Sequence, residues 1–481
     1  MVEENNYQEL GFKCGLEIHQ QLDTKKLFCN CPSLLRKDEP DFEIKRKLHA
    51  VAGESGEVDV AAKHEAGLRK EFIYQGYDTT CLVELDEEPP HQINEESLKI
   101  TLQISILLHA KIIPVTQIMR KTVIDGSNTS GFQRTVLIAK EGYVDTEQGR
   151  VRIENICLEE DAARIVERSK EKVIYKLDRL GIPLVEITTF PDIKNPEQAK
   201  EVALKIGNIL RSCKVKRGIG TIRQDVNLSV SGHPRVELKG VQDMRIFVKT
   251  IQNEIERQKE NIEDKKLFSE VRNALPDAST EFLRPVPGAA RMYPETDLPL
   301  LKISREVINN AKKNIPKLKG DLEEELKGKG LNKEMIKSLF KQNKLDDFKE
   351  FLEIVDNPPL IGKIILLFPK EIASHEKIAF SKINKILNKD ILIFVLEALE
   401  NKKISEAQVK NVLVRIVRGE KLEDSILFEK EDTSFIEEKI MKIIKNKPGL
   451  SENAYMGLVM KEFKGKVDGK TAREVIEKYL K

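Results

Sequence analysis

The sequence contains no tryptophan, and aromatic residues make up only 5% of its 481 residues. Long hydrophobic runs are missing as well: apolar stretches such as 364–368 and 391–396 are far too short to cross a bilayer. The first ten residues are acidic and hold no apolar segment of the kind found in signal peptides. These absences predict a protein without membrane spans that works in the cytoplasm.

Cysteine is scarce, and its six positions are scattered: 14, 29, 31, 81, 157 and 213. In a sequence without a secretion signal, this spacing does not indicate a disulfide framework. Cys29, Cys31 and Cys81 supply three of the four ligands that a structural zinc site needs, but a second close cysteine pair is missing. Buried thiols are the alternative, and the sequence leaves the choice open.

The net charge of +2 hides an asymmetry between the two parts of the chain. Residues 1–300 hold 44 Lys and Arg against 49 Asp and Glu, whereas residues 301–481 hold 37 against 30. An acidic first part suits a site that gathers cations, and a basic second part suits a polyanion such as RNA. Solvated faces of lysine-rich helices are the alternative explanation.

Hydrophobic patterning predicts a mixed α+β fold for residues 11–300. Alternating apolar residues and Gly, Asn and Asp turn signals predict short antiparallel strands that include 122–124, 135–139, 150–153 and 236–239. A 3.6-residue periodicity predicts helices at about 95–110, 196–213 and 243–262. The second of these helices has a clear start, because Asn195 can cap it and Pro196 suits its first turn.

Beyond Pro299 strand signals fade, and amphipathic helices continue to the end of the chain. We therefore predict three domains: an α+β domain at 1–302, a helical domain at 303–405 and a small helical tail at 406–481. Residues 441–481 carry 10 basic and 5 acidic side chains.

The segment Gly15–Leu22 (GLEIHQQL) alternates apolar and polar residues as a strand does. Side chains repeat every two residues in a strand, so Glu17 and His19 should share one face, and Cys14 should lie on the other. A carboxylate beside an imidazole can bind a metal or exchange a proton. An ordinary, partly exposed strand is the alternative.

Further acidic residues follow in apolar surroundings, at Glu159, Glu160 and Glu186. Carboxylates are the ligands that Mg²⁺ prefers, often where it bridges phosphate oxygens. The alternatives are a solvated acidic turn at 159–161 and an ion pair between Glu186 and Arg179. The sequence contains neither a Walker loop nor a kinase glycine-rich loop, so a nucleotide site here would be of another type.

Several long motifs of the first 300 residues resemble one known family. They read GLEIHQQLDTKKLFCNCPS, CLVELDEEPP, RKTVIDGSNTSGFQRT, LEEDAAR, LDRLGIPLVEI, GIGTIRQDVNLSV, RVELKGVQDM and LRPVPGAARMYPETDLP. These words are similar to the GatB/GatE family of tRNA-dependent amidotransferase subunits, and RMYPETD and DGSNTSGFQRT look like its archaeal GatE branch. The resemblance is specific over about 11–300 and weaker in the helical part.

The resemblance implies a fold, a reaction and partners. The fold would be a cradle domain, a helical domain and a tail resembling the YqeY protein. The enzyme would use ATP and Mg²⁺ to phosphorylate the γ-carboxylate of Glu-tRNA(Gln), and ammonia would then give Gln-tRNA(Gln). The ammonia would come from an asparaginase-like partner, GatD, in a heterotetramer of two GatD and two GatE chains.

The resemblance also implies roles for residues of this sequence. The metal ligands would be His19, Glu186 and Glu159 or Glu160, with Glu17 beside them. Positions that line the same cradle and would hold phosphate or the aminoacyl end are Arg223, Asp225, Asn227, Glu237 and Lys239. Residues 129–134 would form a wall of the ammonia route.

One departure from the family concerns tRNA selection. Family members of the GatE branch usually carry a domain resembling part of bacterial aspartyl-tRNA synthetase just before the motif EVRNALPDASTEFLRP. Here the predicted helix 243–262 reaches that motif after a short connection. The sequence also leaves two other functions open: a GatB-type protein acting on both Glu-tRNA(Gln) and Asp-tRNA(Asn), and a non-catalytic tRNA-binding scaffold.

Overall fold

The structure is a computed structural model. It describes residues 7–47, 70–123, 125–169, 171–265, 267–286, 292–342, 344–428, 433–463 and 469–480. The chain divides into two compact units, Met1–Lys319 and Gly320–Lys481. In the described residues all strands lie in the first unit, and the second contains helices alone. The predicted α+β class is confirmed, whereas the division into three domains at 302 and 405 stays a prediction.

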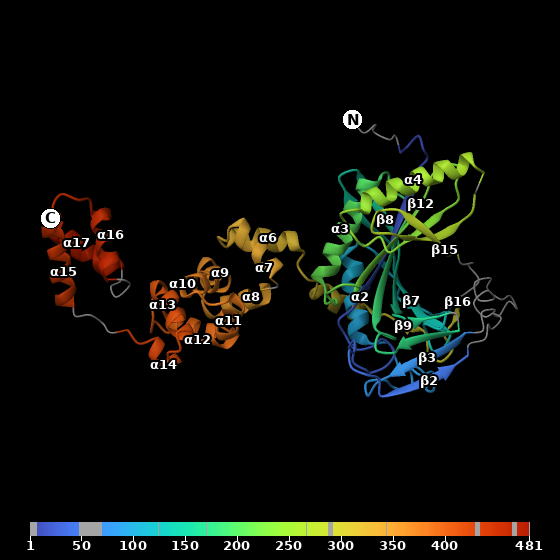
Figure 1. Cartoon of the computed structure of the whole chain (residues 1–481), viewed down its shortest axis with the longest axis horizontal. Coiled ribbons are helices and arrows are strands. Elements are labelled where there is room, and N and C mark those ends of the chain that lie inside the picture. Colours follow the sequence, from blue (N-terminus) through green and yellow to red (C-terminus); the bar gives the residue numbers. More distant parts are fainter. Residues whose placement is uncertain are drawn as a thin grey trace. The chain divides into compact units, whose positions relative to one another are not determined.

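An 11-stranded sheet dominates the described part of the first unit (Figure 1). Its centre runs in the order β12 (Ile222–Ser229), β1 (Lys13–Gln21), β11 (Pro183–Thr189), β8 (Gly149–Glu160) and β7 (Phe132–Thr146), all antiparallel. Its other strands are β4 (Lys111–Ile112), β6 (Ile118–Thr122), β13 (Val236–Lys239), β14 (Glu270–Ala274), β15 (Thr280–Pro285) and β16 (Met292–Pro294). The pair β13–β14 is parallel.

Two smaller sheets accompany the large one. One contains β2 (Phe42–Arg46), β3 (Glu71–Gly76), β10 (Lys172–Lys176) and β9 (Arg164–Arg168) in that order, and the other pairs β5 (Val115–Thr116) with β17 (Leu301–Lys302). Three of the four predicted strands lie within β7, β8 and β13. The predicted strand at 122–124 is displaced, because β6 ends at Thr122, and residue 124 lies outside the described residues.

Helices α2 (Glu95–Leu107), α3 (Pro196–Ser212) and α4 (Phe247–Glu263) contribute to the apolar core on one face of the large sheet. Helix α3 begins as predicted: Asn195 Oδ1 accepts the backbone N–H of Gln198 at 2.8 Å, and Pro196 occupies the first turn. Helix α4 begins four residues later than predicted. Asp243 Oδ1 accepts the N–H of Arg245 at 2.9 Å, which forms a turn before the helix.

The alternation along β1 assigns its side chains to two faces. Leu16 and Ile18 are buried in the core that the helices cover. Glu17 and His19 therefore face the opposite, open side of the sheet, as the sequence predicted, while Cys14 lies on the covered side. The fold thus separates an apolar face, which packs, from a polar face, which is available for chemistry.

The remaining helices pack around two further apolar cores. In the first unit, α5 (Arg305–Lys313) packs against α2. In the second unit, residues 326–417 form one core and residues 436–476 form another. The helices of the second unit are α6 (Lys319–Gly328), α7 (Lys333–Lys341), α8 (Leu345–Ile354), α9 (Pro358–Leu366), α10 (Phe368–Glu376), α11 (Phe380–Ile386), α12 (Lys389–Glu400), α13 (Glu406–Val417), α14 (Leu422–Ser425), α15 (Thr433–Asn446), α16 (Glu452–Phe463) and α17 (Gly469–Leu480).

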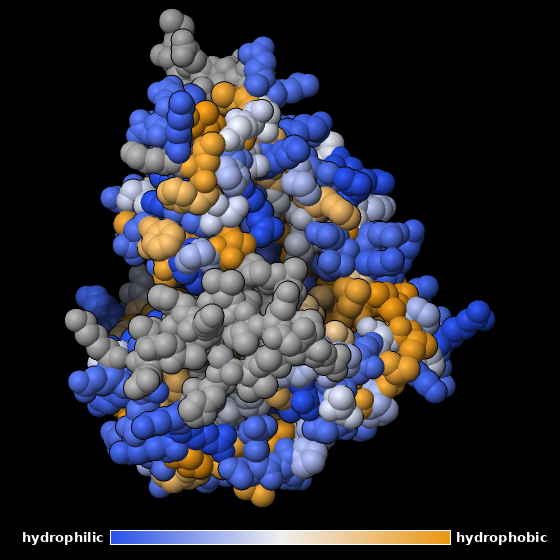
Figure 2. All heavy atoms as spheres, turned by 90° about the vertical axis from the view of Figure 1, so that its right-hand side faces the viewer, coloured by the Kyte–Doolittle hydropathy of each residue, from blue (hydrophilic) through white to orange (hydrophobic). Residues whose placement is uncertain are grey.

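None of the helices in the described residues has the length and apolar character needed to cross a membrane. Hydrophilic side chains predominate on the face drawn in Figure 2, with smaller apolar groups between them. This surface agrees with a sequence in which 33% of the residues are charged.

Candidate active site

Neighbouring strands of the large sheet bring the predicted acidic residues to His19. In the register of β1 with its two neighbours, His19 lies opposite Glu186 of β11, and Glu17 lies opposite Asp225 of β12. One strand further, Glu159 of β8 is paired with the residue two before Glu186. The sheet therefore places residues that are far apart in the sequence on one patch of its open face.

The side chains of this patch, which we call the His19 cluster (Glu17, His19, Glu159 and Glu186), lie close together. His19 Nε2 lies 3.2 Å from Glu186 Oε2, 3.5 Å from Glu17 Oε1 and 3.6 Å from Glu159 Oε1. The Glu159 side chain is only 2% exposed, and the His19 side chain is 14% exposed. The ion pair between Glu186 and Arg179 does not form, because Arg179 donates to the backbone oxygens of residues 162 and 163.

Burial and charge together shift the pKa values of the cluster. Burial alone would lower the pKa of His19, but its hydrogen bond to Glu186 and the nearby carboxylates raise that pKa to about 9. Burial and the charge of Glu186 raise the pKa of Glu159 to about 7 and also raise the pKa of Glu17. Against the effect of burial, the hydrogen bond from His19 and the charge of Lys121 lower the pKa of Glu186 to about 2.

The donor set fits a divalent cation. The ligand atoms of His19, Glu159 and Glu186 lie within 4.8 Å of one another, as do those of Glu17, His19 and Asp225. Glu159 Oε2 is buried and accepts no hydrogen bond from the described residues, so a cation here would satisfy it. Carboxylates with one imidazole suit Mg²⁺ or Mn²⁺ better than a thiophilic metal.

Basic side chains stand beside the cluster. Lys121 Nζ of β6 lies 3.6 Å from Glu186 and 3.8 Å from Glu159. Sequence reasoning did not assign Lys121 a role, although it lies within the motif RKTVIDGSNTSGFQRT, because nothing local indicates that β6 and β8 flank the same strand. The cluster therefore carries a positive charge where an anionic substrate would approach a bound cation.

The predicted phosphate-binding residues form a second group on β12 and β13. Lys239 Nζ lies 2.8 Å from Asp225 Oδ2 and 2.8 Å from Glu237 Oε1. Burial would lower the pKa of Lys239, but these two carboxylates raise it above its usual range. Asn227 lies opposite Glu237 in the sheet and shares the face of Asp225. Lys239 is thus held charged by neighbours that orient it.

Arg223 is held at another corner of the same face. It lies opposite His19 in the register, and its Nη2 donates to Asp161 Oδ1 at 2.9 Å. Asp161 is buried and also accepts a hydrogen bond from Gln21 Nε2 at 2.6 Å. Asp161 and Gln21 lay in quoted motifs, but the sequence did not single them out, because their pairing depends on contacts between distant strands.

The structure separates Glu160 from Glu159. Successive residues of a strand point to opposite faces, and Glu160 turns away from the His19 cluster toward Arg134 of β7. Arg134 donates its backbone N–H to Glu160 Oε2 at 3.1 Å and its Nε to Glu295 Oε2 at 2.8 Å. The geometry favours Glu159 as the metal ligand and does not bring Glu160 to that position.

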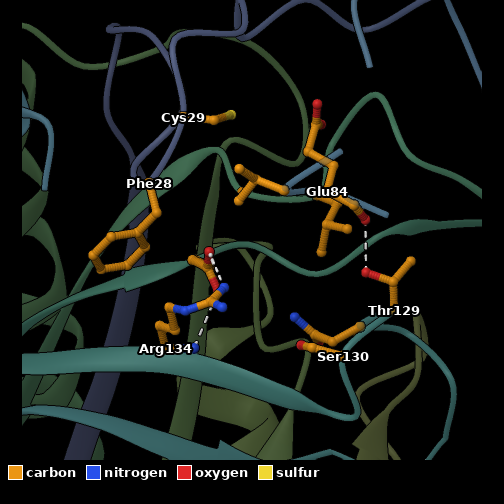
Figure 3. A pocket seen from close by; sticks show the side chains of 11 residues that line it. Phe28, Cys29, Glu84, Thr129, Ser130 and Arg134 are labelled. Atoms are coloured by element: carbon orange, nitrogen blue, oxygen red, sulfur yellow. Dashed lines mark hydrogen bonds and ion pairs between the residues drawn. The ribbon is translucent and has the colours of Figure 1, made fainter. Parts of the chain in front are cut away.

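Arg134, Glu160, Phe28, Thr129 and Ser130 line a pocket of about 330 Å³ together with six other residues. Figure 3 shows Arg134 and Phe28 on one side of this pocket, across from Glu84 and Thr129. The Arg134 guanidinium lies 5.7 Å from the centre of the Phe28 ring. Three residues of the predicted route wall, 129, 130 and 134, therefore do line one cavity.

We expect Arg134→Met to destabilise the first unit strongly. Arg134 is buried and faces Glu160 and Glu295, so its loss leaves two buried carboxylates without their partner. Breaking a buried ion pair in this way costs about 3–5 kcal/mol. Thermal unfolding followed by circular dichroism measures the change. Arg152→Met is the matched control, because Arg152 forms an exposed pair with Asp192, and its loss should cost at most about 1 kcal/mol.

The fold and the cluster define a class of protein before any comparison. It is an α+β domain whose open sheet face carries a buried carboxylate–histidine cluster ringed by oriented lysine and arginine side chains. Such an arrangement is typical of an enzyme that handles a metal-bound, anionic substrate.

Comparisons with known proteins identify the family. Residues 12–309 match the family described as the GatB/GatE catalytic domain. The chain is 36% identical to the E chain of glutamyl-tRNA(Gln) amidotransferase from Methanocaldococcus jannaschii, over 99% of this chain and 100% of that one. The E chain of the same enzyme from Methanococcus maripaludis strain C7 is 49% identical, over 99% of both chains. The chain belongs to the GatB/GatE family and carries its catalytic domain.

The relatives are longer than this chain. The alignment with the Methanocaldococcus protein spans 636 positions, although this chain has 481 residues, so the relative contains long segments without a counterpart here. In the structure, α4 ends at Glu263 and β14 begins at Glu270, which leaves no room for an inserted domain between them. The expected departure from the family is therefore present at this position.

Proposed function

We propose that this protein is the GatE-type component of a glutamyl-tRNA(Gln) amidotransferase. It would transfer the γ-phosphoryl group of ATP to the γ-carboxylate of Glu-tRNA(Gln), and ammonia would then displace phosphate to give Gln-tRNA(Gln). The observation that carries this proposal is the meeting of three carboxylates on His19 within 3.6 Å, beside oriented basic groups. The names of the curated relatives, which are E chains of this amidotransferase, support the choice of substrate.

The chemistry explains why both charge types are needed. A carboxylate resists attack by ammonia because its leaving group would be oxide, and phosphorylation replaces this with phosphate. His19, Glu159 and Glu186, with Glu17 beside them, would hold Mg²⁺, which neutralises negative charge on the phosphoryl group during transfer. Phosphoryl transfer otherwise depends on positioning, which the oriented basic side chains supply.

Two of these basic side chains have defined roles in the proposal. Lys239, fixed between Asp225 and Glu237, would contact the phosphate groups. Arg223, fixed by Asp161, would contact the aminoacyl end of the tRNA. Both side chains are about a third exposed and reach the open face, so a bound substrate could contact them without a rearrangement of the sheet. Asn227 lies on the same face as a further polar contact.

Ammonia must reach the phosphorylated intermediate before water does. We place part of its route in the pocket beside Arg134, because Glu160 in the pocket wall directly follows Glu159 of the cluster. The ammonia would come from a separate asparaginase-like protein, GatD, in an assembly of two GatD and two GatE chains. Because the substrate is an aminoacyl-tRNA, this assembly would work in the cytoplasm.

A single assay separates this proposal from its alternatives. The purified chain is incubated with Glu-tRNA(Gln), ATP, Mg²⁺ and ammonium, and both ADP and Gln-tRNA(Gln) are measured. We expect ADP and Gln-tRNA(Gln) to form in equal amounts. Complete absence of ATP hydrolysis would support a non-catalytic scaffold instead, and equally fast conversion of Asp-tRNA(Asn) would support a GatB-type protein.

We expect the C-terminal helices to bind the tRNA backbone, because the inserted domain is absent. Helices α15–α17 have their own apolar core, and residues 441–481 have twice as many basic as acidic side chains. Truncation after residue 428 should weaken tRNA binding and flatten its salt dependence by about 0.9 per lost phosphate contact. Filter binding at several salt concentrations measures both effects.

A matched substrate makes the truncation experiment specific. An aminoacylated minihelix holds only the acceptor arm, so the truncated chain should convert it as fast as the full chain does. If full-length tRNA binds both chains with the same affinity and salt slope, the basic tail is a solvated surface without a role in recognition.

A further inference from the structure

A second cluster of metal-binding side chains lies away from the His19 cluster. Its members are Cys29, Cys31, Cys81 and Glu84, which we call the thiol cluster. Their three sulfur atoms and one carboxylate oxygen all lie within 4.8 Å of one another. The sequence left this region undecided because only three ligands were visible in it. The fold supplies the fourth, since Glu84 follows Cys81 by three residues on one turn.

Both loops that carry these ligands are held by backbone hydrogen bonds. The N–H of Lys26 donates to the carbonyl of Cys31 at 3.0 Å, which closes the first loop. In the second loop, the N–H of Glu84 donates to the carbonyl of Cys81, and Glu84 Oε2 accepts the N–H of Cys81 at 2.9 Å. The four ligand atoms are thus gathered by the backbone, and little rearrangement is needed to bind an ion.

The surroundings of the thiol cluster suit a charged centre. Cys29 and Glu84 are buried, whereas Cys31 and Cys81 are half-buried and leave a path for a metal ion to enter. The ammonium of the buried Lys26 contacts Glu84 Oε1 and donates to the carbonyl of Leu177. Three thiolates and one carboxylate exceed the charge of a divalent cation, and a buried ammonium offsets part of that excess.

We propose that Cys29, Cys31, Cys81 and Glu84 bind one Zn²⁺ ion in a closed, structural site. Three thiolates and one carboxylate complete the tetrahedral coordination that Zn²⁺ adopts in such sites. Soft sulfur ligands select Zn²⁺ over Mg²⁺, so this site and the His19 cluster would hold different metals within one domain. All six cysteines are free thiols in the structure, which leaves the three sulfur atoms available as ligands.

The position of the site indicates what the zinc would do. Cys29 and Glu84 line the same pocket as Arg134 and Glu160, and Figure 3 shows both near Thr129 and Phe28. The backbone carbonyl of Glu84 accepts the hydroxyl of Thr129 at 2.7 Å. Zinc would join the two loops that form one wall of this pocket and so fix the shape of the pocket.

Metal analysis of the untagged, full-length chain tests this proposal. After reconstitution with Zn²⁺ under reducing conditions and removal of excess metal, we expect about one zinc per chain. Cys31→Ser and Cys81→Ser should lose most of it, and Glu84→Gln should retain it at least about tenfold more weakly in competition with a chelator. Cys213→Ser is the matched control, because this buried thiol lies outside the cluster, and it should retain the full zinc content.

A second measurement needs no variant. Replacement of zinc by Co²⁺ in the wild-type chain should give the visible absorption of a tetrahedral site together with a thiolate charge-transfer band. An octahedral cobalt spectrum, or the same zinc content in the wild type and in Cys81→Ser, would overturn the proposal. So would a metal-free chain in which thiol titration finds two of the three cysteines oxidised. Because the readout is metal content, the result does not depend on the proposed reaction.

Discussion

The variant Glu159→Gln should lose at least about a hundredfold of its ATP-dependent phosphorylation of Glu-tRNA(Gln), yet remain folded. Glu159 is the most buried carboxylate of the His19 cluster, and its Oε2 accepts no hydrogen bond from the described residues. A neutral amide of the same shape cannot replace a charged ligand of Mg²⁺. Because the amide also removes one of several crowded negative charges, the melting temperature should not fall. ADP release and circular dichroism measure the two quantities.

Neighbouring carboxylates make this experiment sharper. Glu160→Gln weakens the ion pair with Arg134, so it should lower the melting temperature while the Mg²⁺ concentration for half-maximal activity stays unchanged. Glu159→Gln should raise that concentration. Glu154→Gln, on the same strand, should alter neither quantity. Unchanged phosphorylation by Glu159→Gln would remove Glu159 from the metal site, and an altered Mg²⁺ requirement in Glu160→Gln would point to Glu160 instead.

Local patterns were sufficient for part of this site. The alternation of residues 15–22 placed Glu17 and His19 on one face, because a strand has a fixed period of two residues. The start of α3 was equally local, since an Asn cap and a following Pro act within one turn. These features depend on residues within a few positions of one another, and the structure confirmed them.

The rest of the site depends on strand order, which no local pattern specifies. Glu159 and Glu160 look alike in the sequence, and only the register of β8 with β11 shows which one reaches the cluster. Lys121 and Glu295 come from strands and loops that are distant in sequence. Glu84 was overlooked as a zinc ligand, because a carboxylate three residues after a cysteine is not a familiar signal. The family resemblance supplied candidate residues, but their contacts required the fold.

Without a second protein, the chain should make Gln-tRNA(Gln) from free ammonium but not from glutamine or asparagine. Releasing ammonia from an amide requires an activated nucleophile beside a general base. The candidate thiols are poorly suited: burial raises the pKa of Cys14, which lies on the covered face of the sheet away from His19, and also raises that of Cys213 to about 11. Cys29, Cys31 and Cys81 are the proposed zinc ligands.

Cys157 is the remaining thiol, and it provides the decisive variant. Burial and the charges of Glu186 and Glu159 raise the pKa of Cys157, so the thiolate needed for attack is disfavoured there. The purified chain is incubated with Glu-tRNA(Gln), ATP and Mg²⁺, and with ammonium, glutamine or asparagine in parallel, and Gln-tRNA is measured. Cys157→Ser should leave the ammonium-dependent rate within about twofold of the wild type, since a thiol held protonated takes no part in the reaction. Formation of Gln-tRNA from either amide, and its loss in Cys157→Ser, would show that the chain generates its own ammonia and would overturn its assignment as one of two cooperating proteins.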